Sequence, residues 1–234
     1  MIAILDYGSG NLRSAQRAFE LTGHKVIITS QADEFLSADA CVVPGVGAFG
    51  ACMDQLISID GVNIVKGAIE KKKPIFGICV GMQIFFQEGL EKGSHKGIGY
   101  FDGTVSELDA PVLPHIGWNT LTTDSELFNG IEDESFYFVH SYAVKTAPAN
   151  SKVAWSEYGE RFVSAVEHES IFVTQFHPEK SHTHGLQLLQ NFAVSGLLKP
   201  HFGQFSIDDT FRRPPVPRPG AGGAYAIAAG QGNR

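Results

Sequence analysis

Cysteine is scarce in this chain, with three residues among 234. Cys41, Cys52 and Cys79 are an odd number and do not have the spacing of a metal-binding motif. A secreted domain held together by disulfides is therefore excluded, and free thiols in a reducing compartment are predicted. Cys41 and Cys52 are most simply core residues, because an unreactive cysteine packs like a small hydrophobic side chain.

Long apolar runs and long basic runs are also absent. No stretch approaches the roughly 20 apolar residues that a membrane-spanning helix needs. Residues 1–6 have no basic segment ahead of an apolar one, as a secretion signal would. The formal net charge of −7 gives no reason to expect nucleic-acid binding. We expect a cytoplasmic protein that binds neither a membrane nor nucleic acid.

The apolar residues, 43% of the chain, form short runs separated by helical patterns in the N-terminal part. Strands are expected at residues 2–5, 26–29, 40–43 and 74–79. Asn11 can cap a helix that carries Leu12, Ala15 and Phe19 on one face. Apolar strands that alternate with helices are typical of a parallel sheet covered on both faces. The predicted fold is a doubly wound α/β domain with a mostly parallel sheet and helices on both faces.

The pattern changes after residue 97. β-rich segments follow at residues 100–108, 136–140, 161–166 and 171–176, ahead of a last helix at about 183–198. We interpret these segments as a β-rich insertion in one domain that spans residues 1–206. Residues 207–234 contain Pro, Gly and Ala without any period, so we expect a disordered tail there.

Cys79 stands in a turn that suits a nucleophile. It follows the apolar run at 74–78, lies between Gly77 and Gly81, and precedes a helical pattern that begins at Met82. A strand, a Gly-x-Cys-x-Gly turn and a helix make up the nucleophile elbow of enzymes that attack carbonyl groups. The glycines permit a strained backbone, and the N-terminus of the helix favours the thiolate. Taken alone, such a cysteine is more often a core residue.

A base for this nucleophile occurs about 100 residues downstream. His177 and Glu179 flank Pro178 directly after the apolar strand at 171–176. In an extended segment, residues two apart project to the same side, and Pro178 favours that geometry. Glu179 could hold one imidazole nitrogen while the other takes the thiol proton, as in a catalytic triad. The pair is weak evidence alone, but together with Cys79 it indicates acyl transfer.

The combination of Cys79, His177 and Glu179 resembles the triad, or class I, glutamine amidotransferases over about residues 1–200. Finer motifs narrow this resemblance to the glutaminase subunits of imidazole glycerol phosphate synthases, which serve histidine biosynthesis. These motifs are Asp6-Tyr7-Gly8-Ser9-Gly10-Asn11, Pro44-Gly45-Val46-Gly47, Pro114-His115-Ile116-Gly117-Trp118-Asn119 and Phe138-Val139-His140-Ser141-Tyr142. The resemblance implies that L-glutamine is hydrolysed to glutamate and ammonia through a thioester on Cys79, without a cofactor.

The resemblance also implies roles for residues around the triad. Oxyanion donors are expected at Val80 and in the loop of Val46 and Gly47, whose glycine neighbours permit more than one peptide orientation. Substrate glutamine would be held by Gln83 on the first turn of the elbow helix, by Glu91 further along that helix, and by Ser141 and Tyr142.

A partner is implied as well. It is a cyclase subunit with a (β/α)₈ barrel fold, which would form a heterodimer with this chain and receive the ammonia. The positions expected to face it are Asn11, Trp118, Tyr137 and Lys180.

Other interpretations stay open at this point. An amidotransferase of the same class could serve another synthase, since the triad alone would be shared, although the motif at 114–119 argues against it. A binding subunit that kept the fold and lost turnover is a second alternative, which the complete triad opposes. No metal site is predicted, because His182 and His184 have no evident third ligand. His140 is interpreted as structural rather than catalytic, since one base suffices.

Overall fold

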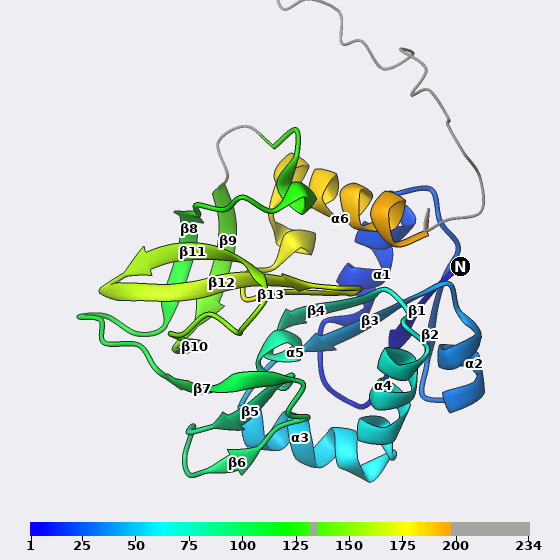
Figure 1. Ribbon diagram of the computed structural model, residues 1–234, viewed down its shortest axis with the longest axis horizontal. Helices are drawn as coiled ribbons and strands as arrows, with labels where there is room; N and C mark the ends of the chain where they lie inside the picture. The colour runs from blue at the N-terminus through cyan, green and yellow to red at the C-terminus, as the bar shows by residue number, and fades with distance from the viewer. Residues whose placement is uncertain (132–134, 198–234) are drawn as a thin grey trace, which may run out of the picture. The chain divides into compact units, whose positions relative to one another are not determined.

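The computed structural model describes residues 1–131 and 135–197. The predicted tail at 207–234 and the predicted domain boundary at 206 lie outside these residues. A central sheet carries helices on both of its faces (Figure 1). Within the described part of the chain, no helix is both long enough and apolar enough to cross a membrane.

The parallel half of the sheet has the order β2-β1-β3-β4-β13. Its strands are β1 (Ile2–Leu5), β2 (Val26–Thr29), β3 (Ala40–Gly45), β4 (Ile75–Cys79) and β13 (Ile171–Thr174). All residues of β1, β3, β4 and β13 are buried, because helices cover both faces of these strands. The doubly wound α/β fold is therefore confirmed.

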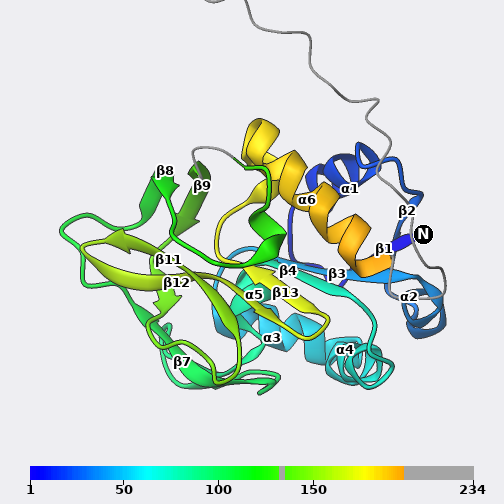
Figure 2. The same ribbon diagram turned by 45° about the horizontal axis from the view of Figure 1, so that its top comes forward.

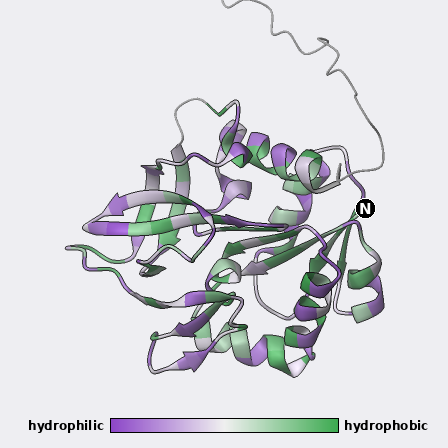
Figure 3. Ribbon diagram, in the orientation of Figure 1, coloured by the Kyte–Doolittle hydropathy of each residue, from purple (hydrophilic) through white to green (hydrophobic). Residues whose placement is uncertain are grey.

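The helices form two layers. They are α1 (Leu12–Glu20) and α6 (His182–Leu197) on one face, and α2 (Ala32–Ser37), α3 (Phe49–Ser58) and α4 (Gly61–Glu70) on the other. Figure 2 shows α1 and α6 side by side over the sheet. Phe19 of α1, Phe76 of β4 and Phe192 of α6 meet edge to face, with ring centroids 5.0–6.2 Å apart. Figure 3 shows the hydrophobic strands of the sheet between these two layers of helices.

The β-rich insertion continues the same sheet with mainly antiparallel pairing. Its strands are β5 (Phe86–Gly89), β6 (His95–Lys96), β7 (Phe101–Glu107), β10 (Tyr142–Val144), β11 (Lys152–Tyr158) and β12 (Glu160–His168). Two further strands, β8 (His115–Thr120) and β9 (Ser135–His140), pair with each other in a separate sheet. This β8–β9 pair ends beside the parallel strands, and the short helix η1 (Glu126–Phe128) lies in its connection.

The elbow helix is much shorter than predicted. Helix α5 spans only Val80–Gln83, and the apolar residues that follow it enter β5. Ile84, Phe85 and Phe86 are all fully buried, so their pattern could not distinguish a helix from a strand. The prediction that Glu91 lies on this helix is wrong, since β5 separates the two.

Two local predictions also need correction. Asn11 occupies the N-cap position of α1, but its side chain makes no capping hydrogen bond. The segment of His177 and Glu179 is not extended throughout, because Pro178–Lys180 form the 3₁₀ helix η2. Proline at the first position of η2 fixes the φ that a helical turn needs.

Candidate active site

Three adjacent parallel strands bring the candidate site together at their carboxyl ends. Cys79 ends β4, where it lies opposite Gly45, the last residue of β3. On the other side of β4, Thr174 of β13 pairs with Ile78, and His177 follows three residues later. Residues far apart in the sequence therefore meet at this edge, as is usual for sites in open α/β sheets.

Cys79 has the strained backbone expected of a nucleophile elbow. Its φ is 57° and its ψ is −114°, in a region that residues with side chains rarely adopt. A Cβ atom at Gly81 would lie 2.0 Å from the Val43 carbonyl oxygen, and one at Gly77 would lie 2.9 Å from the Gly81 oxygen. Glycine is therefore required on both sides of the turn for this close contact with the sheet.

His177 and Glu179 are paired despite the turn between them. The imidazole Nδ1 lies 2.8 Å from Glu179 Oε1, and both side chains are buried. Burial by itself would lower the pKa of His177, but hydrogen bonds to Cys79 and Glu179, together with their charges, outweigh burial and raise this pKa to about 10. The geometry therefore favours an imidazolium beside the sulfur of Cys79, the arrangement that activates a cysteine nucleophile.

A cavity of about 400 Å³ opens in front of Cys79 and His177. Its walls include all four residues expected to hold glutamine, which are Gln83, Glu91, Ser141 and Tyr142, and the expected oxyanion residues Val46, Gly47 and Val80. Glu91 reaches this cavity from the turn after β5, where its Oε2 accepts a hydrogen bond from the Phe49 N–H at 3.0 Å. A carboxylate in this wall suits a substrate ammonium group.

The oxyanion loop is held by residues beneath it. The N–H of Val46 donates to Ser9 Oγ at 3.2 Å, and the carbonyl of Val46 accepts hydrogen bonds from Ser9 Oγ at 3.0 Å and from Cys52 Sγ at 3.2 Å. The Val46 N–H is thus engaged with Ser9 and is not free to bind an oxyanion. Gly47 has a φ of +92°, and a Cβ atom added to it would have no neighbouring atom within 4 Å. The loop therefore has space to rearrange.

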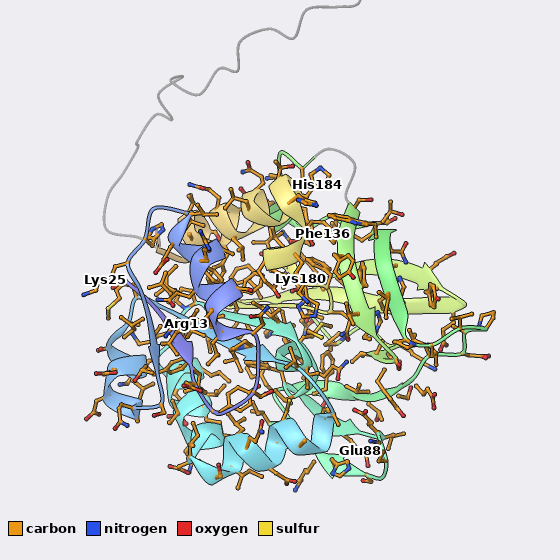
Figure 4. All side chains as sticks on the ribbon, turned by 180° about the vertical axis from the view of Figure 1, so that it is seen from behind. Arg13, Lys25, Glu88, Phe136, Lys180 and His184 are labelled. Carbon is orange, nitrogen blue, oxygen red and sulfur yellow. The ribbon has the colours of Figure 1, made fainter. Side chains whose placement is uncertain are left out.

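Of the residues expected to face a partner, Lys180 lines the site, Tyr137 and Trp118 lie beside it, and Asn11 lines a separate hollow. On β8, the side chains of Trp118 and Ile116 are 47% and 59% exposed. Trp118 stacks on His182 with ring centroids 5.2 Å apart and meets Tyr137 edge to face at 6.0 Å. Lys180 lines both the active-site cavity and a groove against α1. Figure 4 labels Lys180 and Arg13, which is two residues from Asn11 and lines a hollow with it.

His140, which lines the cavity, holds the backbone of Tyr142 and is paired with a second buried histidine, His115. His140 Nδ1 lies 3.0 Å from the Tyr142 carbonyl oxygen, and His140 Nε2 lies 3.1 Å from His115 Nδ1. Burial lowers the pKa of His140 to about 3 and that of His115 to about 4, so both rings are neutral at pH 7. The Tyr142 carbonyl oxygen can only accept, so His140 donates to it from Nδ1 and has a bare Nε2. That Nε2 accepts the hydrogen bond that His115 donates from its own Nδ1. The interpretation of His140 as structural fits this geometry.

Acidification should therefore destabilise the protein. Both histidines bind protons in the unfolded state below about pH 6.5 but resist them in the folded state, so the free energy of unfolding falls as the pH falls below about 6.5. We expect His115→Gln, whose amide can still donate to His140, to reduce the slope between about pH 6.5 and 5 by about 1 kcal/mol per pH unit. Urea unfolding at several pH values measures this slope. An unchanged slope would show that His115 is already charged in the folded protein.

The sequence alone gave no role to Gln175 or Ser9. Gln175 is fully buried, and its Nε2 lies 3.8 Å from Cys79 Sγ. Its position at the end of β13, two residues before His177, was the available signal, but a buried glutamine has no chemical signature of its own. Among the described residues, no group of three or more His, Cys, Asp or Glu side chains could hold a metal ion.

Comparison with known proteins agrees with this geometry. The family model for class-I glutamine amidotransferases matches residues 3–195, and the chain belongs to that family. A solved structure titled "Crystal structure of glutamine amidotransferase" superimposes with a TM-score of 0.68 at 16% identity, covering 84% of this chain and 98% of that one. The structure of PurLQS from Thermotoga maritima gives a TM-score of 0.63 at 17% identity, covering 83% and 97%. At this identity the likeness shows the fold.

Sequence relatives place the chain more narrowly. It is 47% identical to the imidazole glycerol phosphate synthase subunit HisH of Renibacterium salmoninarum over 205 residues, which are 83% of this chain and 94% of the relative. The HisH subunit of Nocardia farcinica is 49% identical, with 83% and 97% covered, and that of Bifidobacterium longum is 48% identical, with 82% and 97% covered. Within the class-I amidotransferases, the chain is thus a member of the HisH family.

Proposed function

We propose that this chain is the glutaminase subunit of an imidazole glycerol phosphate synthase. It hydrolyses L-glutamine to glutamate and ammonia and delivers the ammonia to a cyclase subunit. The observation that carries the chemistry is that Cys79 and His177 line one cavity of about 400 Å³, with Glu179 Oε1 2.8 Å from His177 Nδ1. The relatives named HisH support the assignment to histidine biosynthesis.

The first half of the proposed reaction forms a thioester. The Cys79 thiolate attacks the side-chain amide carbon of glutamine, and the negative charge moves to the amide oxygen. Protonated His177 then gives its proton to the amide nitrogen as the C–N bond breaks, which releases ammonia. Glu179 holds Nδ1 of the ring and stabilises its charge throughout. The N–H of Val80, which follows the nucleophile, is one donor for the oxyanion.

The second half hydrolyses the thioester. A water molecule loses a proton to His177 and attacks the thioester carbon, after which the C–S bond breaks and glutamate leaves. Gln83, Glu91, Ser141 and Tyr142 would hold the substrate during both halves. Glu91 suits the ammonium group of glutamine by charge.

The partner in this proposal is a cyclase with a (β/α)₈ barrel, bound at the rim marked by Asn11, Trp118, Tyr137 and Lys180. The exposure of Trp118 and its stack on His182 support this rim as a contact surface, since rigid aromatic side chains are common interface anchors. Ammonia would then pass into the barrel rather than into solvent. The complex is proposed to be cytoplasmic.

Activation by the partner is part of the proposal. The Val46 N–H donates to Ser9 in the isolated chain. This N–H becomes the second oxyanion donor, beside Val80, only when the Gly45–Val46 peptide flips. One such donor is worth about 10²- to 10³-fold in rate, and we expect activation of about that size. The direct test measures glutamine hydrolysis by the chain alone, with the cyclase, and with the cyclase and its ligand. Equal rates in all three would reject this activation, and no hydrolysis in any would reject the glutaminase assignment.

Ser9 gives a separate test of the loop. Ser9→Ala removes the acceptor that holds the Val46 N–H, and a net hydrogen bond of this kind is worth about 2- to 10-fold in an equilibrium. We expect glutamine hydrolysis by the chain without partner to rise by about that factor. Steady-state kcat/KM measures it, with Ser58→Ala on the exposed end of α3 as the matched control. A rate equal to or below that of the unaltered chain would contradict the proposal that Ser9 keeps the Val46 N–H away from the oxyanion site.

A further inference from the structure

Gln175 lies directly beneath the nucleophile. Its backbone N–H donates to the Ser164 carbonyl at 2.8 Å, which ties it to β12. Its side chain is fully buried between Gln83 and Cys79. The Gln175 Oε1 accepts a hydrogen bond from Gln83 Nε2 at 3.0 Å, and the Gln175 Nε2 lies 3.8 Å from Cys79 Sγ. The amide therefore contacts the reactive sulfur from the side of the protein core.

The neighbouring contacts fix which end of this amide meets the sulfur. A backbone carbonyl can only accept, so Gln83 must turn its Nε2 toward the Tyr142 oxygen, which lies at 2.9 Å. The second N–H of Gln83 then donates to Gln175, which must accept with its side-chain oxygen. The nitrogen of Gln175 is left to face Cys79. Gln83 therefore donates to Gln175, and Gln175 donates to the Cys79 sulfur.

We propose that Gln175 is a positioning residue that donates an N–H to the Cys79 thiolate. The proposal rests on the nucleophile role proposed for Cys79. A hydrogen bond to a charged acceptor in a buried site is stronger than one between neutral groups. It would hold Sγ in place and favour the thiolate over the thiol.

The amide supplies something that His177 cannot. His177 gives up its proton when ammonia leaves and acts as a base while the thioester is hydrolysed. An amide N–H does not ionise, so Gln175 keeps its proton through the whole cycle. When the C–S bond breaks and its electron pair returns to sulfur, Gln175 can stabilise the departing thiolate.

Two variants separate this role from packing. Gln175→Glu keeps the size and the acceptor for Gln83 but places an oxygen where the N–H was. Gln175→Met removes both hydrogen bonds at similar volume. Gln190→Glu and Gln190→Met are the matched controls, on the exposed face of α6.

The readout is alkylation of Cys79 by iodoacetamide, measured on the full chain by peptide mass spectrometry from about pH 5 to about pH 10. We expect both Gln175 variants to react about 10-fold more slowly near pH 7, with the midpoint of the pH profile about one unit higher. In the complex, kcat should fall about 10- to 100-fold, while KM for glutamine changes less than about threefold. Native rates and midpoints in both variants would overturn the proposal.

A measurement on the unaltered chain covers the case in which a variant does not fold. In ¹⁵N spectra, the side-chain amide signal of Gln175 should shift when Cys79 is alkylated, whereas that of Gln190 should not. An unmoved Gln175 signal would overturn the proposal as firmly as native alkylation. Alkylation of Cys79 does not require glutamine hydrolysis, so the two tests can fail separately. If the Gln175 variants slow alkylation as expected but the complex does not hydrolyse glutamine, the proposed function is rejected and the contact of Gln175 with Cys79 stands.

Discussion

Cys79→Ala should abolish glutamine-dependent synthesis by the complex, with kcat reduced by at least about 10⁴-fold. The reason is that no thioester can form, and removal of the nucleophile of a catalytic triad costs about as much as removal of all three members. Cys79→Ser should fall nearly as far, because a hydroxyl at neutral pH is a much weaker nucleophile than a thiolate. The measurement is product formation from glutamine by the chain and its cyclase together.

Two controls make this result specific. Synthesis from added ammonium salt should survive in both variants, since the proposed cyclase site lies on the partner. A glutamine analogue that carries an electrophile should label Cys79 in the unaltered chain. Cys41 and Cys52 are fully or almost fully buried, and predominant labelling of either would show that the nucleophile has been misassigned.

Glu179→Gln is expected to have the second largest effect, a fall in kcat of about 10³-fold with little change in KM for glutamine. The substitution keeps the size of the side chain but removes the charge next to His177 Nδ1 at 2.8 Å. The imidazolium then loses one of the two partners that raise its pKa. The neutral ring is a poorer acid for the leaving ammonia.

The pH dependence adds a second readout for this variant. Without the Glu179 charge, the proton on His177 should be lost at a lower pH, so the alkaline limb of the kcat profile should move toward neutral pH. Glu126→Gln, at the exposed position of the helix η1, is the matched control. If Glu179→Gln kept native kcat and the native profile, His177 would not depend on this carboxylate.

Much of the fold follows from local patterns in the sequence. The strands β1, β3 and β4 could be predicted because each is a short apolar run, and a run that is buried on both faces needs no alternation. The same reasoning failed just after the elbow. Ile84, Phe85 and Phe86 are buried on every side, so apolar character alone could not show that α5 ends at Gln83 and a strand begins at Phe86.

The position of Glu91 shows how such an error spreads. A longer helix would have carried Glu91 on its surface, whereas the structure delivers it to the cavity by way of β5 and a turn. Glu91 nevertheless lines the same cavity as Cys79 and His177. A role as ligand of glutamine stays a prediction for Glu91, as it does for Gln83, Ser141 and Tyr142.

By itself, the sequence determined the kind of chemistry. Cysteine in a glycine turn, histidine and glutamate two residues apart, and the accompanying motifs define an acyl-transfer site of the amidotransferase class. These features are local, since each depends on a few neighbouring residues.

Tertiary structure alone decided how these groups meet. Parallel pairing of β4 with β13 brings Cys79 and His177 together, and it sets Gln175 against the sulfur. The contact of Ser9 with the Val46 N–H likewise depends on the orientation of one peptide in a loop. Strand pairing and peptide orientation are governed by packing and hydrogen bonds between distant segments, and no local pattern in the sequence encodes them.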